Sequence, residues 1–225
     1  MKIYFDDFIY GSIDGAVTTF AIVAGVMGAS LPSAIILILG FANLFADGFS
    51  MAAANYQASK ARNEFVQMKR KQEEWEIDNL EEQERDEIRD IYREKGFKDE
   101  LLEDVVRIIT SKRKVWVDTM MREELGLVEN SKNPIHSAIS TFVGFNAIGL
   151  IPLLPFAIFF DNDFAMSDTI WYSVSATACA FFLIGVIKGK IVKHSLIKSG
   201  MSSLFVGSIA ASIAYLVGSL LHGLI

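Results

Sequence analysis

Two apolar stretches near the N-terminus carry the polar side chains that are best suited to chemistry. Asp14 is the only charged residue between positions 8 and 29, and Asp47 is the only one between positions 31 and 57. A carboxylate in such a stretch costs several kcal/mol in lipid and is a functional candidate for that reason. Asn43, Asp47 and Met51 follow at intervals of four residues, so an amide, a carboxylate and a thioether share one helical face. This combination favours a path for transition-metal ions over one for Mg²⁺ or Ca²⁺, which prefer oxygen ligands alone.

Each of these residues also has a structural interpretation. Asp14 is flanked by glycines and is compatible with a helix N-cap near a membrane interface. Met51 alone is typical of a packing residue, and Asp47 is compatible with a hydrated position near a helix end. In a transport path Asp14 would have a further role. A carboxylate takes up a proton when a metal ion leaves it, so Asp14 would couple the metal-ion flux to a proton flux.

A second group of carboxylates lies in the middle of the chain. Glu73 and Glu76 form one Glu-x-x-Glu pair, and Glu84 and Glu87 form another. The spacing puts both carboxylates of a pair on one helical face, where they repel unless a cation bridges them. A further carboxylate–thioether set follows at the end of the same charged region: Met120, Met121 and Glu124. In a glutamate-rich region each pair is also typical of a solvated helix face, so spacing alone leaves both interpretations open.

The distribution of charge sets the class of protein. Residues 60–132 hold 36 of the 48 charged side chains, 16 basic and 20 acidic. A soluble domain does not segregate charge in this way, because each amphipathic element needs its own polar face. The single cysteine excludes a disulfide framework, and the net charge of −6 argues against a nucleic-acid partner. The chain has no Walker loop, no Glu-x-x-His pair and no histidine between positions 60 and 132.

Apolar stretches long enough to span a bilayer predict five transmembrane helices, over residues 8–29, 31–57, 134–160, 169–187 and 199–225. Segments 60–132 and 188–198 are rich in Lys and Arg, whereas segments 29–32 and 161–168 have neither. The positive-inside rule therefore predicts a cytoplasmic N-terminus, a cytoplasmic insert over 60–132 and a C-terminus outside or in a lumen. Within the insert, span two is expected to continue as a helix to a break at Asp78-Asn79. Further helices are expected over about 81–95 and 99–125.

The motifs around these residues resemble the vacuolar iron transporter family. The resemblance rests on residues 14–26 (DGAVTTFAIVAGV), 40–52 (GFANLFADGFSMA), 133–134 (NP), 150–156 (LIPLLPF) and 185–189 (GVIKG). It covers essentially the whole chain. It implies five-span protomers that form a homodimer and export ferrous iron from the cytosol in exchange for protons. Manganese is used by some members, and an insert of this kind serves as a cytoplasmic helical metal-binding domain.

The resemblance also implies roles for individual residues. Asp14 matches the pore carboxylate of span one, and Met51 matches the pore methionine of span two. The insert ligands match Glu73, Glu76, Glu84, Glu87, Met120, Met121 and Glu124, all present at the family's spacing. Asn43 departs from the family, since members with this insert often carry glutamate there. Asp47, one turn further on, is expected to compensate for that missing charge.

The sequence therefore predicts an all-α membrane protein with transmembrane helices in 1–59 and 133–225 and a three-helix cytoplasmic domain in 60–132. The predicted function is proton-coupled export of Fe²⁺, with Mn²⁺, Zn²⁺ and Co²⁺ as further candidate ions, across a vacuolar or plasma membrane. No enzymatic activity and no prosthetic group are expected. Two alternatives stay open: a membrane-anchored ferroxidase that oxidises Fe²⁺, and a metal sensor that binds ions without transporting them.

Overall fold

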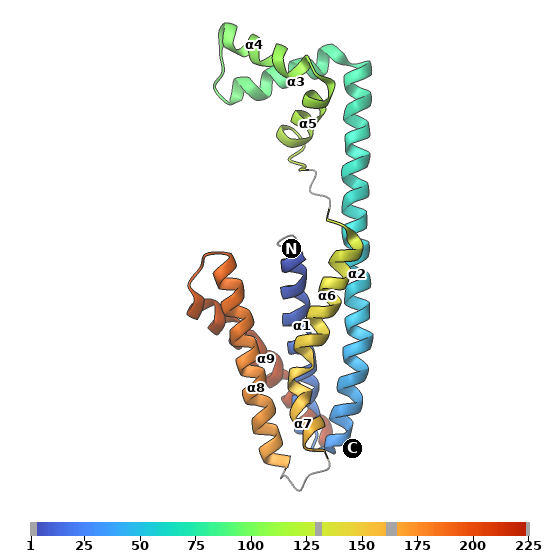
Figure 1. Cartoon of the computed structure of the whole chain (residues 1–225), viewed down its shortest axis with the longest axis vertical. Helices are drawn as coiled ribbons and strands as arrows, with labels where there is room; N and C mark the ends of the chain where they lie inside the picture. The colour runs from blue at the N-terminus through green and yellow to red at the C-terminus, as the bar shows by residue number, and fades with distance from the viewer. Residues whose placement is uncertain (1–3, 129–131, 161–165, 224–225) are drawn as a thin grey trace. The chain divides into compact units, whose positions relative to one another are not determined.

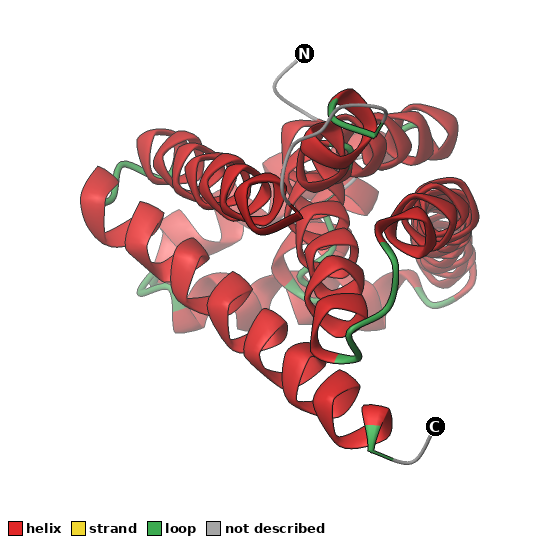
Figure 2. Cartoon of the chain, turned by 90° about the horizontal axis from the view of Figure 1, so that it is seen from below, coloured by secondary structure: helices red, strands yellow, loops and turns green. Residues whose placement is uncertain are grey.

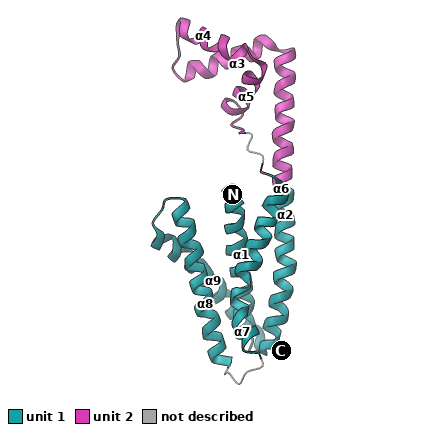
Figure 3. Cartoon of the chain, viewed as in Figure 1, with its two compact units in different colours: residues 1–57, 133–225 teal, residues 58–132 magenta. Residues whose placement is uncertain are grey.

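The computed structural model of the chain describes residues 4–128, 132–160 and 166–223, and every regular element within those ranges is a helix (Figure 1). The elements are α1 (Phe5–Gly28), α2 (Ser33–Asn79), α3 (Glu81–Glu94), α4 (Asp99–Thr110), α5 (Arg113–Glu123), α6 (Pro134–Gly149), the 3₁₀ turn η2 (Ile151–Leu153), α7 (Leu154–Ile158), α8 (Met166–Ile191) and α9 (Leu196–His222). The chain divides into unit 1, residues 1–57 and 133–225, and unit 2, residues 58–132 (Figure 3). Helix α2 is continuous and contributes to both units.

Five helical segments are long and apolar enough to cross a membrane, which confirms the predicted all-α membrane architecture. They are α1, α2, the run from α6 to α7, α8 and α9. The predicted spans agree with these helices to within a few residues. The predicted continuation of span two as a helix to Asp78-Asn79 is also confirmed, since α2 ends at Asn79. The break predicted at Asp161-Asn162-Asp163 lies outside the described residues.

Helix α1 is the packing centre of unit 1, where it contacts α6, α8 and α9. Its close approach to α6 depends on Gly11 and Gly15. A Cβ atom at either glycine would lie 2.2 Å from a backbone oxygen of α6, that of Thr141 or Phe145. Small residues of this kind let two helix backbones come together and gain dispersion energy where lipid offers no hydrophobic driving force.

The other small-residue motifs also serve contacts within the chain. Gly185 of α8 lies against the backbone of α9 at Ser199 and Gly200, and Gly207 of α9 lies against the ring of Phe181. Helix α9, which leads to the C-terminus in Figure 2, runs obliquely to its neighbours. It exposes most of its apolar surface, with only 11% of its span buried, as expected of a helix that faces lipid or another subunit.

The third span is not one continuous helix. Pro152 and Pro155 interrupt it, so that α6 passes through η2 into α7. A proline inside a helix removes a donor and clashes with the preceding turn. The hydroxyl of Ser173 in α8 donates to the Pro152 carbonyl at 2.7 Å, which satisfies one of the groups that the break exposes. The break also turns Leu153 into the apolar core of unit 1.

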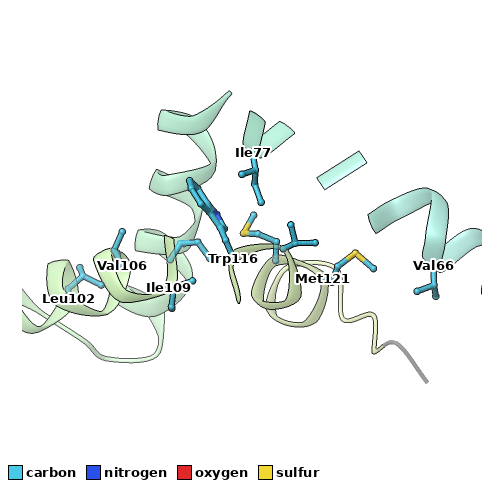
Figure 4. Packing of buried hydrophobic residues seen from close by; sticks show 10 residues of the cluster. Val66, Ile77, Leu102, Val106, Ile109, Trp116 and Met121 are labelled. Carbon is cyan, nitrogen blue, oxygen red and sulfur yellow. The ribbon is translucent and has the colours of Figure 1, made fainter. Parts of the chain in front are cut away.

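Unit 2 has its own apolar core, drawn in Figure 4. Its buried side chains come from α2, α3, α4 and α5: Val66, Ile77, Ile88, Leu102, Val106, Ile109, Trp116, Val117, Met120 and Met121. Helix α3 ends at Glu94, close to the predicted end at about residue 95, and Gly96 follows with a φ of +98° that suits glycine.

The single helix predicted over 99–125 is wrong, because the chain breaks at Ser111 and Lys112 into α4 and α5. Ser111 Oγ donates to the Ile108 carbonyl at 2.7 Å and stabilises the end of α4. Arg113 then pairs with Asp78, at 2.7 Å for the shorter contact, and holds the start of α5 against the end of α2. The break brings the apolar faces of both short helices into one core.

Candidate functional site

The predicted ligands of the charged region gather in unit 2. Glu73 and Glu76 lie on the last turns of α2, Glu84 and Glu87 lie on α3, and Glu124 follows α5. Glu73 and Glu84 are each only 3% exposed, although they are carboxylates. Oε2 of each is buried with no hydrogen-bond partner among the residues that the structure describes. A buried carboxylate oxygen without a donor is costly and therefore indicates a site that takes up a proton or a cation.

The carboxylates of this cluster act on one another through their charges. Burial, and then repulsion from the neighbouring carboxylates, raises the pKa of Glu73 to about 7. The same two causes raise the pKa of Glu84 to about 7, with Glu87 as its strongest charged neighbour. Desolvation of the carboxyl group, and then repulsion from Glu87 and Glu76, raises the pKa of Glu124 as well. The five glutamates predicted as ligands thus form one electrostatic cluster.

The cluster does not form a closed cage. Within the described ranges, no three His, Cys, Asp or Glu side chains are arranged so that they could hold a metal ion. The cluster is therefore defined by the mutual repulsion of its carboxylates and not by a closed set of ligands.

The two methionines of the predicted ligand set lie in the core of unit 2. Met120 is fully buried and Met121 is 3% exposed. Both therefore pack in the core of unit 2, and their role as thioether ligands stays a prediction. Glu124, by contrast, is exposed at the C-terminal end of α5, where its backbone N–H donates to the Met120 carbonyl at 3.0 Å.

In unit 1 the predicted path residues lie on α1 and α2. Asp14 is half-buried on α1, and the charge of Asp47 on α2 lies close enough to interact with it. Thr18, which shares the face of Asp14, donates to the Asp14 backbone carbonyl at 2.9 Å. Each of the two apolar helices α1 and α2 thus carries one carboxylate within its membrane-spanning part.

The remaining two members of the α2 row differ in their surroundings. Asn43 is half-buried, and its Nδ2 is buried with no hydrogen-bond partner in the part of the chain that the structure describes. Met51 is half-buried and packs against the apolar core of unit 1. Asp47 is exposed on the surface of the single chain, and the exposed rings of Phe45 and Phe49 lie on roughly the opposite side of α2.

A polar junction that sequence reasoning missed joins three helices of unit 1. Asn55 Nδ2 of α2 donates to Asp7 Oδ1 of α1 at 3.1 Å and to Thr141 Oγ1 of α6 at 2.7 Å. The signal was an amide placed four residues beyond Met51, on the face of the predicted path, but no pattern in the sequence named its partners. The junction fixes α2 against α1 and α6 at the end of the row.

The fold and these sites define a class of protein: a polytopic helical membrane protein with carboxylate clusters suited to cations. The sequence profile of the VIT family matches residues 5–219, so the chain belongs to the VIT family.

Individual relatives match over nearly the whole chain. The vacuolar iron transporter of Toxoplasma gondii is 36% identical over 224 residues, covering 95% of this chain and 73% of that protein. The vacuolar iron transporter of Plasmodium falciparum is 33% identical, covering 95% of this chain and 80% of that protein. Vacuolar iron transporter 1 of Arabidopsis thaliana is 32% identical, covering 93% of this chain and 82% of that protein.

Proposed function

We propose that this protein exports ferrous iron from the cytosol in exchange for protons, with Mn²⁺, Zn²⁺ and Co²⁺ as further substrates. The observation that carries the proposal is the position of Asp14 and Asp47 in two apolar stretches, residues 8–29 and 31–57, that hold no other charged residue. Such a pair is costly in lipid and gains its stabilisation from a cation or a proton. The relatives named as vacuolar iron transporters support iron as the substrate.

In this proposal the path is lined by Asp14 of α1 and by the row of Asn43, Asp47 and Met51 on α2. Asp14 and Asp47 bind the cation, and each takes up a proton when the cation leaves, which couples the two fluxes. Asp47 replaces the charge that Asn43 does not supply. The Nδ2 of Asn43, which has no acceptor among the described residues, points to a role as a hydrogen-bond donor to water or to a carboxylate in the path. Met51 adds a thioether, which favours Fe²⁺ over Mg²⁺ and Ca²⁺.

Unit 2 is proposed as the cytoplasmic domain that captures the ion. Its ligands are the five clustered glutamates with the thioethers of Met120 and Met121. The raised pKa values of Glu73 and Glu84 support this role, because a carboxylate near pH 7 exchanges a proton for a metal ion readily. The ion then passes from unit 2 to the transmembrane path.

We further propose that two copies of the chain form a homodimer. Asp47 is exposed within the apolar part of α2, residues 33–57, where it is the only charged residue. A carboxylate that faced lipid there would be strongly disfavoured, whereas a second copy would cover it and enclose the path. The N-terminus and unit 2 are placed in the cytoplasm and the C-terminus outside or in a vacuolar lumen. This orientation rests on the Lys and Arg of segments 60–132 and 188–198.

Reconstitution into proteoliposomes tests this function. Purified protein is inserted into vesicles that contain a metal indicator and a pH dye, and Fe²⁺ or Mn²⁺ is added under anaerobic conditions. The wild type is expected to take up metal while the lumen loses protons, and Asp14→Asn is expected to do neither. Asp168→Asn, at the start of α8, is the matched control and should transport normally.

Other outcomes separate the alternatives. Metal that binds without crossing the membrane would contradict the transport proposal and favour a sensor. Oxygen consumption on addition of Fe²⁺ would instead favour a ferroxidase, against which the missing Glu-x-x-His pair argues.

A further inference from the structure

We propose that Gln72 and Gln83 are positioning residues for divalent cations bound by unit 2, each holding one carboxylate of its neighbouring Glu-x-x-Glu pair. The inference rests on the proposed role of unit 2 in metal capture. It adds two neutral residues that are not ligands and that set how well the ligands bind.

A short repeat first draws attention to these glutamines. Residues 72–77 (QEEWEI) and 83–88 (QERDEI) share the pattern Gln-Glu-x-x-Glu-Ile. Both copies also show the same order of burial: exposed Gln, buried Glu, one half-buried and one exposed residue, half-buried Glu and buried Ile. The first copy lies at the end of α2 and the second lies in α3. Two segments with the same pattern and the same burial present equivalent halves of one acidic cluster.

In each copy the glutamine donates a hydrogen bond to the second glutamate. Gln72 Nε2 lies 3.1 Å from Glu76 Oε1, and Gln83 Nε2 lies 3.4 Å from Glu87 Oε1. The donor lies one helical turn before its acceptor, so the contact is local and survives movement between the helices. One oxygen of each carboxylate is thereby held and the other is left for a cation. Partners of this kind orient metal-binding carboxylates.

The first glutamate of each copy is different, since it is buried and its Oε2 has no donor among the described residues. These are Glu73 and Glu84, each 3% exposed. The two copies therefore offer the same pair of groups, an inner carboxylate that lacks a partner and an outer carboxylate that an amide holds in place. A cation would satisfy the inner oxygen and meet an outer one that is already oriented.

The copies differ at one position, which predicts unequal effects. Lys69 Nζ donates to Gln72 Oε1 at 3.0 Å, and Leu80 stands at the corresponding place before Gln83. Because ammonium can only donate, it fixes the Gln72 carbonyl toward Lys69 and the amide N–H toward Glu76. Gln83 lacks such a partner on the same turn. Gln72 is therefore the stronger positioning residue of the two.

The test is a Co²⁺ titration of the full-length protein in detergent, followed by the visible absorption of the bound ion. Gln72→Ala is expected to weaken the Co²⁺ affinity by about tenfold, and Gln83→Ala by less. Asn79→Ala is the matched control. Its exposed amide also lies near the end of α2, but it bonds the Trp75 backbone carbonyl instead of a carboxylate, so the affinity should not change. Hydrogen exchange of metal-free unit 2 should be the same in all three variants.

A double-mutant cycle separates positioning from a general structural effect. In a Glu76→Gln background the further change Gln72→Ala should have no effect, because the carboxylate it holds is gone. Equal losses in both backgrounds, or an unchanged affinity of Gln72→Ala in the wild-type background, would overturn the inference. A different variant tests the proposed role of unit 2 itself. If the double variant Glu73→Gln/Glu84→Gln bound Co²⁺ as tightly as the wild type, that role would be wrong, whatever the effect of Gln72→Ala.

Discussion

Replacing Glu84 by glutamine is expected to stabilise metal-free unit 2 while weakening its binding of divalent cations. The side chain is 3% exposed, and burial, together with Glu87, Glu73, Glu76 and Glu124, raises its pKa from 4.5 to about 7. The fold therefore disfavours the charged form at neutral pH. A neutral amide of the same shape removes this penalty.

The magnitude follows from the shift of the pKa. A rise from 4.5 to about 7 corresponds to about 3 kcal/mol for one carboxyl group, and solvent around the cluster screens this to roughly 1–2 kcal/mol. Because the fold raises the pKa of Glu84, this side chain does not destabilise unit 2 below pH 4.5, where it is protonated in both the folded and the unfolded state. The destabilisation grows as the pH rises from 4.5 to about 7, since the unfolded state loses its proton before the folded state does. At pH 7.5 the wild type therefore carries the full penalty and the glutamine variant carries none.

Hydrogen exchange of the full-length protein in detergent measures this effect. At pH 7.5, without metal, the slowest amides of α3 and α5 should exchange about 5- to 30-fold more slowly in Glu84→Gln than in the wild type. Glu82→Gln is the control, since Glu82 is an exposed carboxylate on the same helix. On addition of Mn²⁺ the order should reverse, because the wild type gains stability from binding and the variant gains less. Exchange in metal-free Glu84→Gln that is as fast as in the wild type would refute the reasoning.

Three further predictions concern other contacts. Gly15→Val should lower the melting temperature in detergent by many degrees, since its Cβ would lie 2.2 Å from the Phe145 carbonyl oxygen, whereas Gly223→Ala, with no atom within 3.4 Å, should not. Asn55→Ala should cost about 1–3 kcal/mol in thermal or denaturant unfolding, because its hydrogen bonds to α1 and α6 are lost. Met120→Leu should change the stability of unit 2 by less than about 1.5 kcal/mol. It should also lower the affinity for Co²⁺ more than that for Mn²⁺ in parallel titrations; an equal loss for both ions would exclude a thioether ligand.

Much of the fold follows from the sequence because its signals are local. The apolar lengths of the five spans, the segregation of charge into residues 60–132 and the glycine at position 96 each act through nearby residues. The break at Ser111 could not be predicted in this way. Leu102, Val106 and Ile109 continue in helical register toward Trp116, so periodicity alone predicts one helix. The packing of two short helices around a single core decides otherwise.

The residue types of the candidate site could be named from the sequence, but their environment could not. Spacing placed both glutamates of each pair on one face and left a solvated surface as an alternative. The structure distinguishes the members of each pair: Glu73 and Glu84 are buried, whereas Glu76 and Glu87 are half-buried and held by glutamines. Burial depends on which helices cover a side chain, and that is a property of the whole unit.

The sequence by itself determined that the chain is helical, crosses a membrane and carries carboxylates where lipid disfavours them, since length, apolarity and charge are properties of single segments. Only the tertiary structure decided which of those groups meet. It brings Asp14 within reach of the charge of Asp47, and it joins the glutamates of α2 and α3 to Glu124 after α5. Electrostatic coupling weakens with distance and is screened by salt beyond about 10 Å, so groups far apart in the sequence couple only when the packing of the helices brings them together.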